Sequence, residues 1–209
     1  VESATRDQKV KSIVLDIESP GGEAVGAFET AALIRKCGEA KPIFAMVNGM
    51  AASAAYALAS GCKAIISTES GLSGSVGVVL LHADYSRAID RAGITPTLIH
   101  AGAHKVDGNP YQPLTKGVQG DLQAEVDRFY DLFLESVATG RGSRLNAKAA
   151  RATEARTFIG RAACEVGLAD DIGSFADLVG ALSSTKTGRT NPQRRASMNM
   201  YSQADLDAA

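Results

Sequence analysis

Short apolar runs alternate with amphipathic stretches along the first half of this 209-residue chain. Runs rich in β-branched residues predict strands, and apolar positions every three or four residues predict helices. Strands are expected at 10–17, 43–47, 63–67, 76–81 and 95–100, and helices at 23–37, 51–60 and 85–92. Strands that alternate with helices are typical of βαβ crossovers, so the pattern predicts an α/β fold with a mainly parallel sheet.

The pattern changes after residue 100. Residues 101–113 contain Gly and Pro and predict a loop, whereas 115–139 predict one long amphipathic helix. Shorter helices are expected at 147–152 and 160–166, and a last short strand and turn at 168–173. The apolar face of the long helix consists of Val118, Leu122, Val126, Phe129, Phe133 and Val137. We expect this helix to serve as a contact in a homo-oligomer.

Composition along the chain predicts three regions. A domain is expected over residues 1–180, followed over 181–197 by a linker rich in Ser, Thr, Lys, Arg, Asn and Pro, which is typical of flexible segments. The segment Ser202-Gln-Ala-Asp205 resembles a capping box at a helix start. Residues 198–209 are therefore expected to begin a helical, scaffold-like region that the chain end truncates.

Charge and cysteine content narrow the partners. With 22 Lys+Arg against 23 Asp+Glu, the net charge of −1 argues against nucleic acid or an anionic membrane as the main partner. The three cysteines form no CxxC pair, which argues against a zinc site or a disulfide framework. The longest apolar stretch, 42–61, is interrupted by Asn48-Gly49, so no membrane segment is expected and the expected location is cytoplasmic.

One serine, Ser53, stands where a predicted strand gives way to a predicted helix. A hydroxyl at such a turn lies near free backbone N–H groups and the positive end of the helix dipole, which suits a nucleophile. Serines at helix starts more often cap the helix. Upstream, the glycines of Ser19-Pro-Gly-Gly22 can bring bare backbone close to a reacting carbonyl. The N–H groups of Gly22 and Ala54 could then converge on an oxyanion in an acyl-transfer site.

A catalytic serine needs a base, and the residues alone leave the choice open. His82 and His100 end predicted strands and His104 lies in the loop that follows, none with an obvious orienting carboxylate. Lys105 is the other candidate, although its spacing alone fits a solvated loop lysine. Lysines are ordinarily ionised at neutral pH, and burial can lower such a pKa by several units.

Five segments, in order, resemble peptidase family S49, the signal-peptide-peptidase A group, which shares the ClpP/crotonase fold. They are Leu15-Asp-Ile-Glu-Ser-Pro-Gly-Gly22, Asn48-Gly-Met-Ala-Ala-Ser-Ala-Ala-Tyr56, Gly74-Ser-Val-Gly77, Gly102-Ala-His-Lys105 and the segment 157–173. One such segment would be weak evidence, whereas five in order at sensible spacing are specific. The resemblance covers residues 11–173.

The resemblance implies a serine peptidase with a Ser/Lys dyad on a ClpP/crotonase-like fold. Ser53 is then the nucleophile, Lys105 the base, Ser75 the residue that orients the lysine, and Gly22 and Ala54 the oxyanion donors. The implied substrate is a polypeptide, and no metal or organic cofactor is implied.

Two departures from the family pattern leave these groups in place. Ala54-Ala55 follows Ser53 where the family usually has Gly-Gly, and Glu18 stands where it usually has Asp. Alanine in place of glycine could narrow the cleft. Family members also have a strand and a helix before the segment that starts here, so these elements are expected to be missing.

The tail resembles the junction in phage and prophage head-maturation proteases, the minor capsid protein C-like branch, where a helical scaffold follows the protease domain. The expected function is the processing of scaffold or capsid proteins in phage head maturation, in the host cytoplasm or within the prohead. Three alternatives remain: a signal-peptide or membrane-peptide hydrolase, a crotonase-type acyl-CoA enzyme, and a catalytically silent capsid assembly module.

Overall fold

A computed structural model describes residues 1–184 of the chain. The chain divides into two compact units: the first comprises Val1–Gly77 and the chain from Leu132 onward, and the second comprises Val78–Asp131. The apolar pattern of the sequence shows no boundary at these points. The rest of the expected linker, 185–197, and the expected helical region, 198–209, lie outside the described residues.

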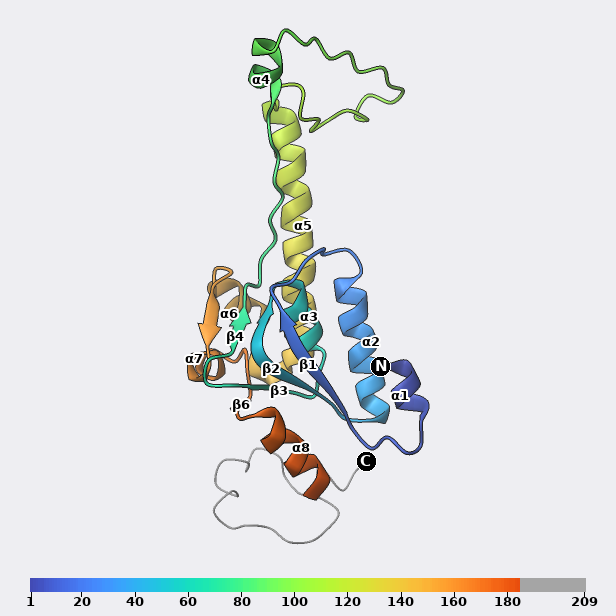
Figure 1. The fold of residues 1–209 in the computed structure, drawn as a ribbon, viewed down its shortest axis with the longest axis vertical. Coiled ribbons are helices and arrows are strands. Elements are labelled where there is room, and N and C mark those ends of the chain that lie inside the picture. The colour runs from blue at the N-terminus through green and yellow to red at the C-terminus, as the bar shows by residue number, and fades with distance from the viewer. Residues whose placement is uncertain (185–209) are drawn as a thin grey trace. The chain divides into compact units, whose positions relative to one another are not determined.

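The first unit is built on a six-stranded sheet (Figure 1). Its longest strand, β2, pairs in parallel with β1, β3 and β4. β6 pairs in parallel with β3, and β5 pairs antiparallel with β4. The strands are β1 (Ile13–Ser19), β2 (Ile43–Ala52), β3 (Ala64–Ser67), β4 (Leu72–Gly74), β5 (Thr157–Ile159) and β6 (Asp171–Ile172). The predicted α/β fold with a mainly parallel sheet is confirmed.

Helices cover both faces of this sheet, which explains why the run from Ile43 to Val47 is apolar at every position. α3 (Ala54–Ser60) packs on β1 and β2, with α2 (Ala27–Ala40) beside it. On the opposite face, α8 (Phe175–Ser184) places Leu178 in a cluster with Phe44, Met46, Ala64 and Ile66. α8 was not predicted, and its last residues fall within the range expected to be linker.

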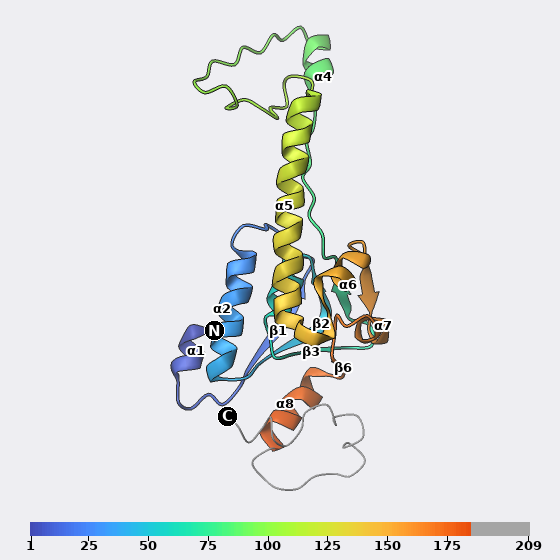
Figure 2. The same cartoon turned by 180° about the vertical axis from the view of Figure 1, so that it is seen from behind.

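The long helix α5 (Lys116–Arg141) begins in the second unit and ends in the first. In its last turns Phe133 and Val137 are buried, and the Phe133 ring lies 5.5 Å from that of Phe28 on α2. The remaining helices of the first unit are α1 (Glu2–Arg6), the 3₁₀ turn η1 (Gly142–Arg144), α6 (Ala147–Ala152) and α7 (Arg161–Glu165), and several are seen best from behind (Figure 2).

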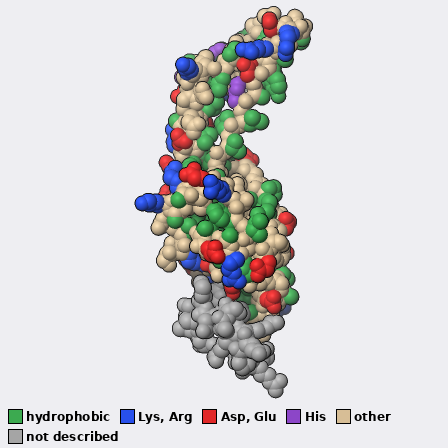
Figure 3. Space-filling view, turned by 90° about the vertical axis from the view of Figure 1, so that its left-hand side faces the viewer, with side chains coloured by type: hydrophobic (Ala, Val, Ile, Leu, Met, Phe, Trp, Pro, Cys, Tyr) green, Lys and Arg blue, Asp and Glu red, His purple; other side chains and the backbone are tan. Residues whose placement is uncertain are grey.

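The second unit contains α4 (Ser86–Arg91) and the first turns of α5. The strands predicted at 76–81 and 95–100 are wrong, because these residues form no strand. No residue from 78 to 131 is buried, and Val79, Leu81 and Ile99 are 90%, 89% and 96% exposed. Hydrophobic side chains are visible at the surface between charged and histidine side chains in Figure 3.

Two predicted boundaries in the first unit are also wrong. β2 does not end at Asn48-Gly49 but continues to Ala52, because a bulge in β2 places residues 48–50 opposite Glu18 and lets Ala51 pair with Ser19. Gly49 has no side chain, and the Glu18 carboxylate occupies the space a Cβ would need. α2 begins at residue 27 and runs through the expected stop, Gly38, to residue 40.

Candidate active site

Ser53 joins the end of β2 to the start of α3, and its backbone is strained. Its φ of 52° and ψ of −129° lie in a region that residues with side chains rarely adopt. Its hydroxyl makes no capping hydrogen bond to α3, so the ordinary role of a serine at a helix start is not the one it fills. A strained strand-to-helix turn is also where the nucleophilic serine of α/β-hydrolases stands.

The turn Ser19–Gly22 lies directly against this serine. A Cβ at Gly21 would stand 2.6 Å from the Ser53 Cβ and 2.8 Å from the Ala52 carbonyl oxygen. The φ of Gly21 is also 104°, so glycine alone fits here. The sequence pattern pointed to Gly22 as a donor and missed Gly21 as the residue that permits the contact. The Gly21-Gly22 pair was the feature of the sequence that could have identified this contact.

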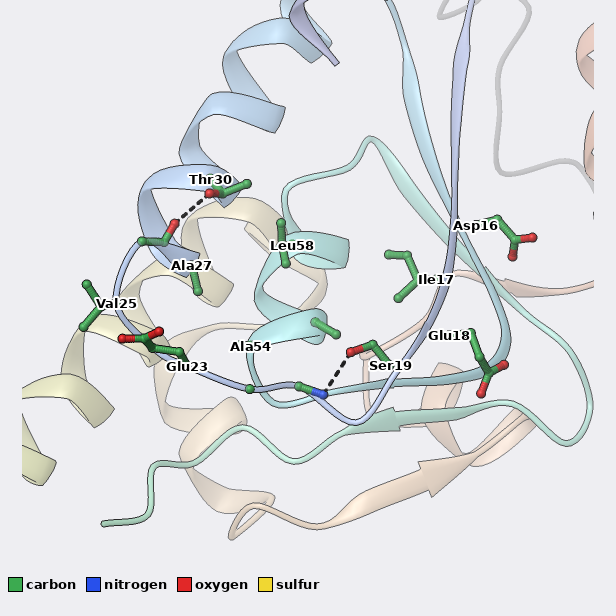
Figure 4. Close-up of a pocket in the computed structure, with 14 residues that line it drawn as sticks. Asp16, Ile17, Glu18, Ser19, Glu23, Val25, Ala27, Thr30, Ala54 and Leu58 are labelled. Carbon is green, nitrogen blue, oxygen red and sulfur yellow. Dashed lines mark hydrogen bonds between the residues drawn. The ribbon is translucent and has the colours of Figure 1, made fainter. Parts of the chain in front are cut away.

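Gly22 and Ala54, the predicted oxyanion donors, both line an open cleft of about 660 Å³ (Figure 4). The cleft lies where β1 ends and α2 and α3 begin, and its apolar lining includes Ile17, Val25, Ala27, Ala55 and Leu58. In Figure 4 the Ile17 side chain points toward α3, whereas Asp16 and Glu18 point away from it. The cleft thus has the predicted donor residues Gly22 and Ala54 and several apolar side chains in its lining.

Ser75, the predicted lysine-orienting residue, lies close to Ser53 in the backbone network. The Ser53 N–H donates to the carbonyl of Gly74, the residue before Ser75, at 2.9 Å. Ser75 also has a positive φ, 53°, and its N–H donates to the Arg156 carbonyl at 2.9 Å. The first unit therefore brings the predicted nucleophile Ser53, the predicted oxyanion donors Gly22 and Ala54, and Ser75 into one neighbourhood.

Lys105, the predicted base, lies in the second unit, exposed in a turn where its N–H donates to the Gly102 carbonyl at 3.2 Å. His104 beside it pairs with Asp107, Nδ1 to Oδ2 at 2.7 Å, and this hydrogen bond and charge raise the pKa of His104. Ser53 and Lys105 thus belong to different units, and their pairing is a proposal.

The other two histidines also have partners in the second unit. The His82 Nε2 lies 3.3 Å from the Asn109 carbonyl oxygen, and the His100 Nδ1 lies 3.0 Å from that of Gly102. Within residues 1–184, no cluster of three His, Cys, Asp or Glu residues could hold a metal ion. No helix in the same range is long and apolar enough to cross a membrane.

The fold is ClpP/crotonase-like, as predicted, and its likeness to a solved structure carries this assignment. The solved structure of the 1510-N membrane-bound stomatin-specific protease is similar, with a TM-score of 0.55 over 83% of this chain and 70% of that one. At 16% identity this likeness shows the shared fold.

The model of peptidase family S49 matches residues 35–188, and the chain belongs to this family. It is 40% identical over 197 residues to the head-tail preconnector protein GP5 of Enterobacteria phage P21, which covers 92% of this chain and 39% of that protein. It is 36% identical over 179 residues to the capsid assembly protease C of Escherichia phage lambda, covering 86% and 40%. The chain thus spans about two-fifths of the length of these relatives.

Proposed function

We propose that this chain is the peptidase domain of a serine endopeptidase with a Ser53–Lys105 dyad. The observation that carries the proposal is Ser53 itself: a serine with positive φ, no capping bond, and Gly21 packed against its Cβ. Membership of peptidase family S49 supports the same class of reaction. The remaining groups in the first unit fit the steps of peptide hydrolysis.

In the proposed mechanism, the Ser53 hydroxyl oxygen attacks the carbonyl carbon of the peptide bond while the neutral Lys105 amine takes the hydroxyl proton. The N–H groups of Gly22 and Ala54 stabilise the oxyanion, a kind of donor whose removal typically costs about 10²- to 10³-fold in rate. The C–N bond then breaks, and the leaving amine receives the proton from Lys105. Water, deprotonated by Lys105, hydrolyses the acyl-enzyme. Ser75 orients the lysine.

The proposed substrates are scaffold or capsid polypeptides during phage head assembly, in the host cytoplasm or in the prohead. Two phage relatives support this choice, and one of them is named a capsid assembly protease. Ile17, Val25 and Leu58 line the cleft and offer an apolar surface to a substrate side chain. A homo-oligomer formed through α5 is part of the proposal.

Labelling with a fluorophosphonate tests the nucleophile and the base. The wild-type chain should take one label at pH 8, Ser53→Ala should take none, and Lys105→Ala should label at least about 100-fold more slowly. Ser143→Ala and Lys116→Ala are matched controls, since each removes the same group at an exposed position, and both should label as wild type does. Equal labelling of Ser53→Ala, or none of wild type, contradicts the proposal.

Co-expression with the capsid and scaffold proteins of the same phage tests the substrate. Mass spectrometry should find them shortened in the presence of the wild-type chain and intact with Ser53→Ala. If maturation proceeds equally with Ser53→Ala, the chain is an assembly module instead. If the wild-type chain binds coenzyme A and forms no serine adduct, the acyl-CoA alternative is correct.

A further inference from the structure

A buried ion pair lies inside the first unit, outside the cleft. Arg141, the last residue of α5, and Asp170, just before β6, have side chains that are 0% and 3% exposed. The guanidinium is bidentate on the carboxylate, with Nη1 to Oδ2 at 2.8 Å and Nη2 to Oδ1 at 2.9 Å. Two charges placed this deep face a large desolvation cost, and the geometry offsets it.

The pair fixes the turn Gly167–Asp170. The Arg141 Nε donates to the Gly167 carbonyl at 3.0 Å, and the Ile65 N–H donates to Asp170 Oδ2 at 2.7 Å. Arg144 adds a bond to Oδ1 at 3.1 Å. Burial alone would raise the pKa of Asp170, but the hydrogen bond and charge of Arg141, with the Ile65 N–H and Arg144, outweigh it and lower that pKa.

Overall stability does not by itself explain such a pair, because replacing a buried ion pair with apolar residues is often neutral or stabilising. What the pair holds is more informative. A bidentate bond fixes both direction and distance, whereas apolar packing tolerates small shifts.

The turn held by this pair contacts both elements that set the backbone of Ser53. Tyr56, fully buried in the first turn of α3, donates its hydroxyl to the Leu168 carbonyl at 2.8 Å. Its N–H donates to the Ser53 carbonyl at 2.8 Å. On the other side, Leu168 Cδ1 would lie 3.4 Å from a Cβ at Gly74, whose carbonyl accepts the Ser53 N–H.

We propose that Arg141 and Asp170 are positioning residues for Ser53, acting through the Gly167–Asp170 turn and the Tyr56 hydroxyl. The pair holds the turn, the turn holds α3 and the end of β4, and these two elements keep Ser53 in its strained conformation. This inference rests on the proposed function, in which Ser53 is the nucleophile.

Two variants of the 209-residue chain test the path. Tyr56→Phe removes only the bond to the turn, and Arg141→Met with Asp170→Leu replaces the pair by apolar side chains. Per folded molecule, fluorophosphonate labelling should slow about tenfold in the first and about 100-fold in the second, the scale on which misplaced reacting groups lose rate. The pH dependence of labelling should keep its midpoint while its plateau falls, because the base is untouched.

Ser60→Ala is the matched control, since it removes another buried hydroxyl from α3 whose bond, to the Ala57 carbonyl at 2.7 Å, stays inside the helix. It should label as wild type does. Labelling of Tyr56→Phe at the wild-type rate, or an equal loss in Ser60→Ala, overturns the proposal, and this comparison decides even if the double variant fails to fold.

Amide hydrogen exchange separates this proposal from the proposed function. Exchange of the Ser53 N–H should be faster in Tyr56→Phe than in wild type or Ser60→Ala. This expectation holds whether or not the wild-type chain reacts with the fluorophosphonate. Unchanged exchange overturns the positioning role, whereas a wild-type chain without label, together with faster exchange in Tyr56→Phe, contradicts only the nucleophile.

Discussion

The two units of this chain use apolar residues in opposite ways. In the first, Ile43, Met46 and Val47 are completely buried in a strand with partners on both sides. In the second, Val79, Leu81 and Ile99 are almost completely exposed, in segments that form no strand. An apolar run therefore becomes a strand here only where neighbouring strands supply its hydrogen-bonding partners and helices cover its faces.

The same contrast separates the two halves of the proposed dyad. Ser53 stands on a backbone held by Gly74, Tyr56 and the Gly21 contact. Lys105 stands in a unit with no buried residue. Substitutions around Ser53 should therefore change stability and activity together, whereas substitutions around Lys105 should change activity with little effect on stability.

The largest effect should come from Gly21→Ala. The added Cβ would lie 2.6 Å from the Ser53 Cβ, and the φ of Gly21 is 104°. The Ser19–Gly22 turn or the turn at Ser53 must therefore move. Fluorophosphonate labelling should fall at least about 100-fold. Gly38→Ala is the control, because nothing lies within 4 Å of its Cβ position. This variant should label normally, and its free energy of unfolding should rise by up to about 1 kcal/mol. Normal labelling of Gly21→Ala would refute the close contact.

Asp170→Asn should have the next largest effect, on stability. Removing one partner of a buried ion pair costs about 3–5 kcal/mol at pH 7, as urea unfolding would measure. The folded state lowers the pKa of Asp170. The ionised Asp170 therefore stabilises the folded state above the pKa of an unfolded Asp, about 3.9, and this stabilisation is lost as the pH falls through the lower pKa of the folded state. The deficit of the variant should therefore shrink below about pH 4, and a pH-independent deficit would contradict this electrostatic account.

The smallest effect compares one substitution in the two units. Ile65→Val, at a completely buried position in β3, should cost about 1 kcal/mol of unfolding free energy. Ile99→Val, at a position that is 96% exposed, should stay within about 0.5 kcal/mol of wild type. Equal losses at both positions would mean that the second unit buries its apolar residues in solution.

Much of the first unit could be predicted from the sequence because its elements carry strong local patterns. The β-branched and apolar residues around Ile13 and Ile43 predicted β1 and β2, and the amphipathic periodicity of α5 was long enough to be clear. The short strands β4 and β5 were missed, since three residues carry no readable period. The exposed strands were predicted wrongly, because a sequence window cannot show that neighbours are absent.

The candidate site was predictable to a similar degree. Ser53 and the candidate donors Gly22 and Ala54 followed from the two turns in the sequence, whereas Ser75 and the choice of Lys105 as base came from the family resemblance. The contact of Gly21 and the chain from Asp170 to Tyr56 were not predictable. They join residues more than thirty and more than one hundred positions apart, which no local pattern records.

The pH dependence of labelling tests the dyad most directly. If Lys105 takes the Ser53 proton as a general base, the labelling rate of the wild-type chain and of Lys116→Ala should rise from pH 6 to 10, and the rise should be lost in Lys105→Ala. A flat wild-type profile over this range, or an unchanged rise in Lys105→Ala, would contradict the account.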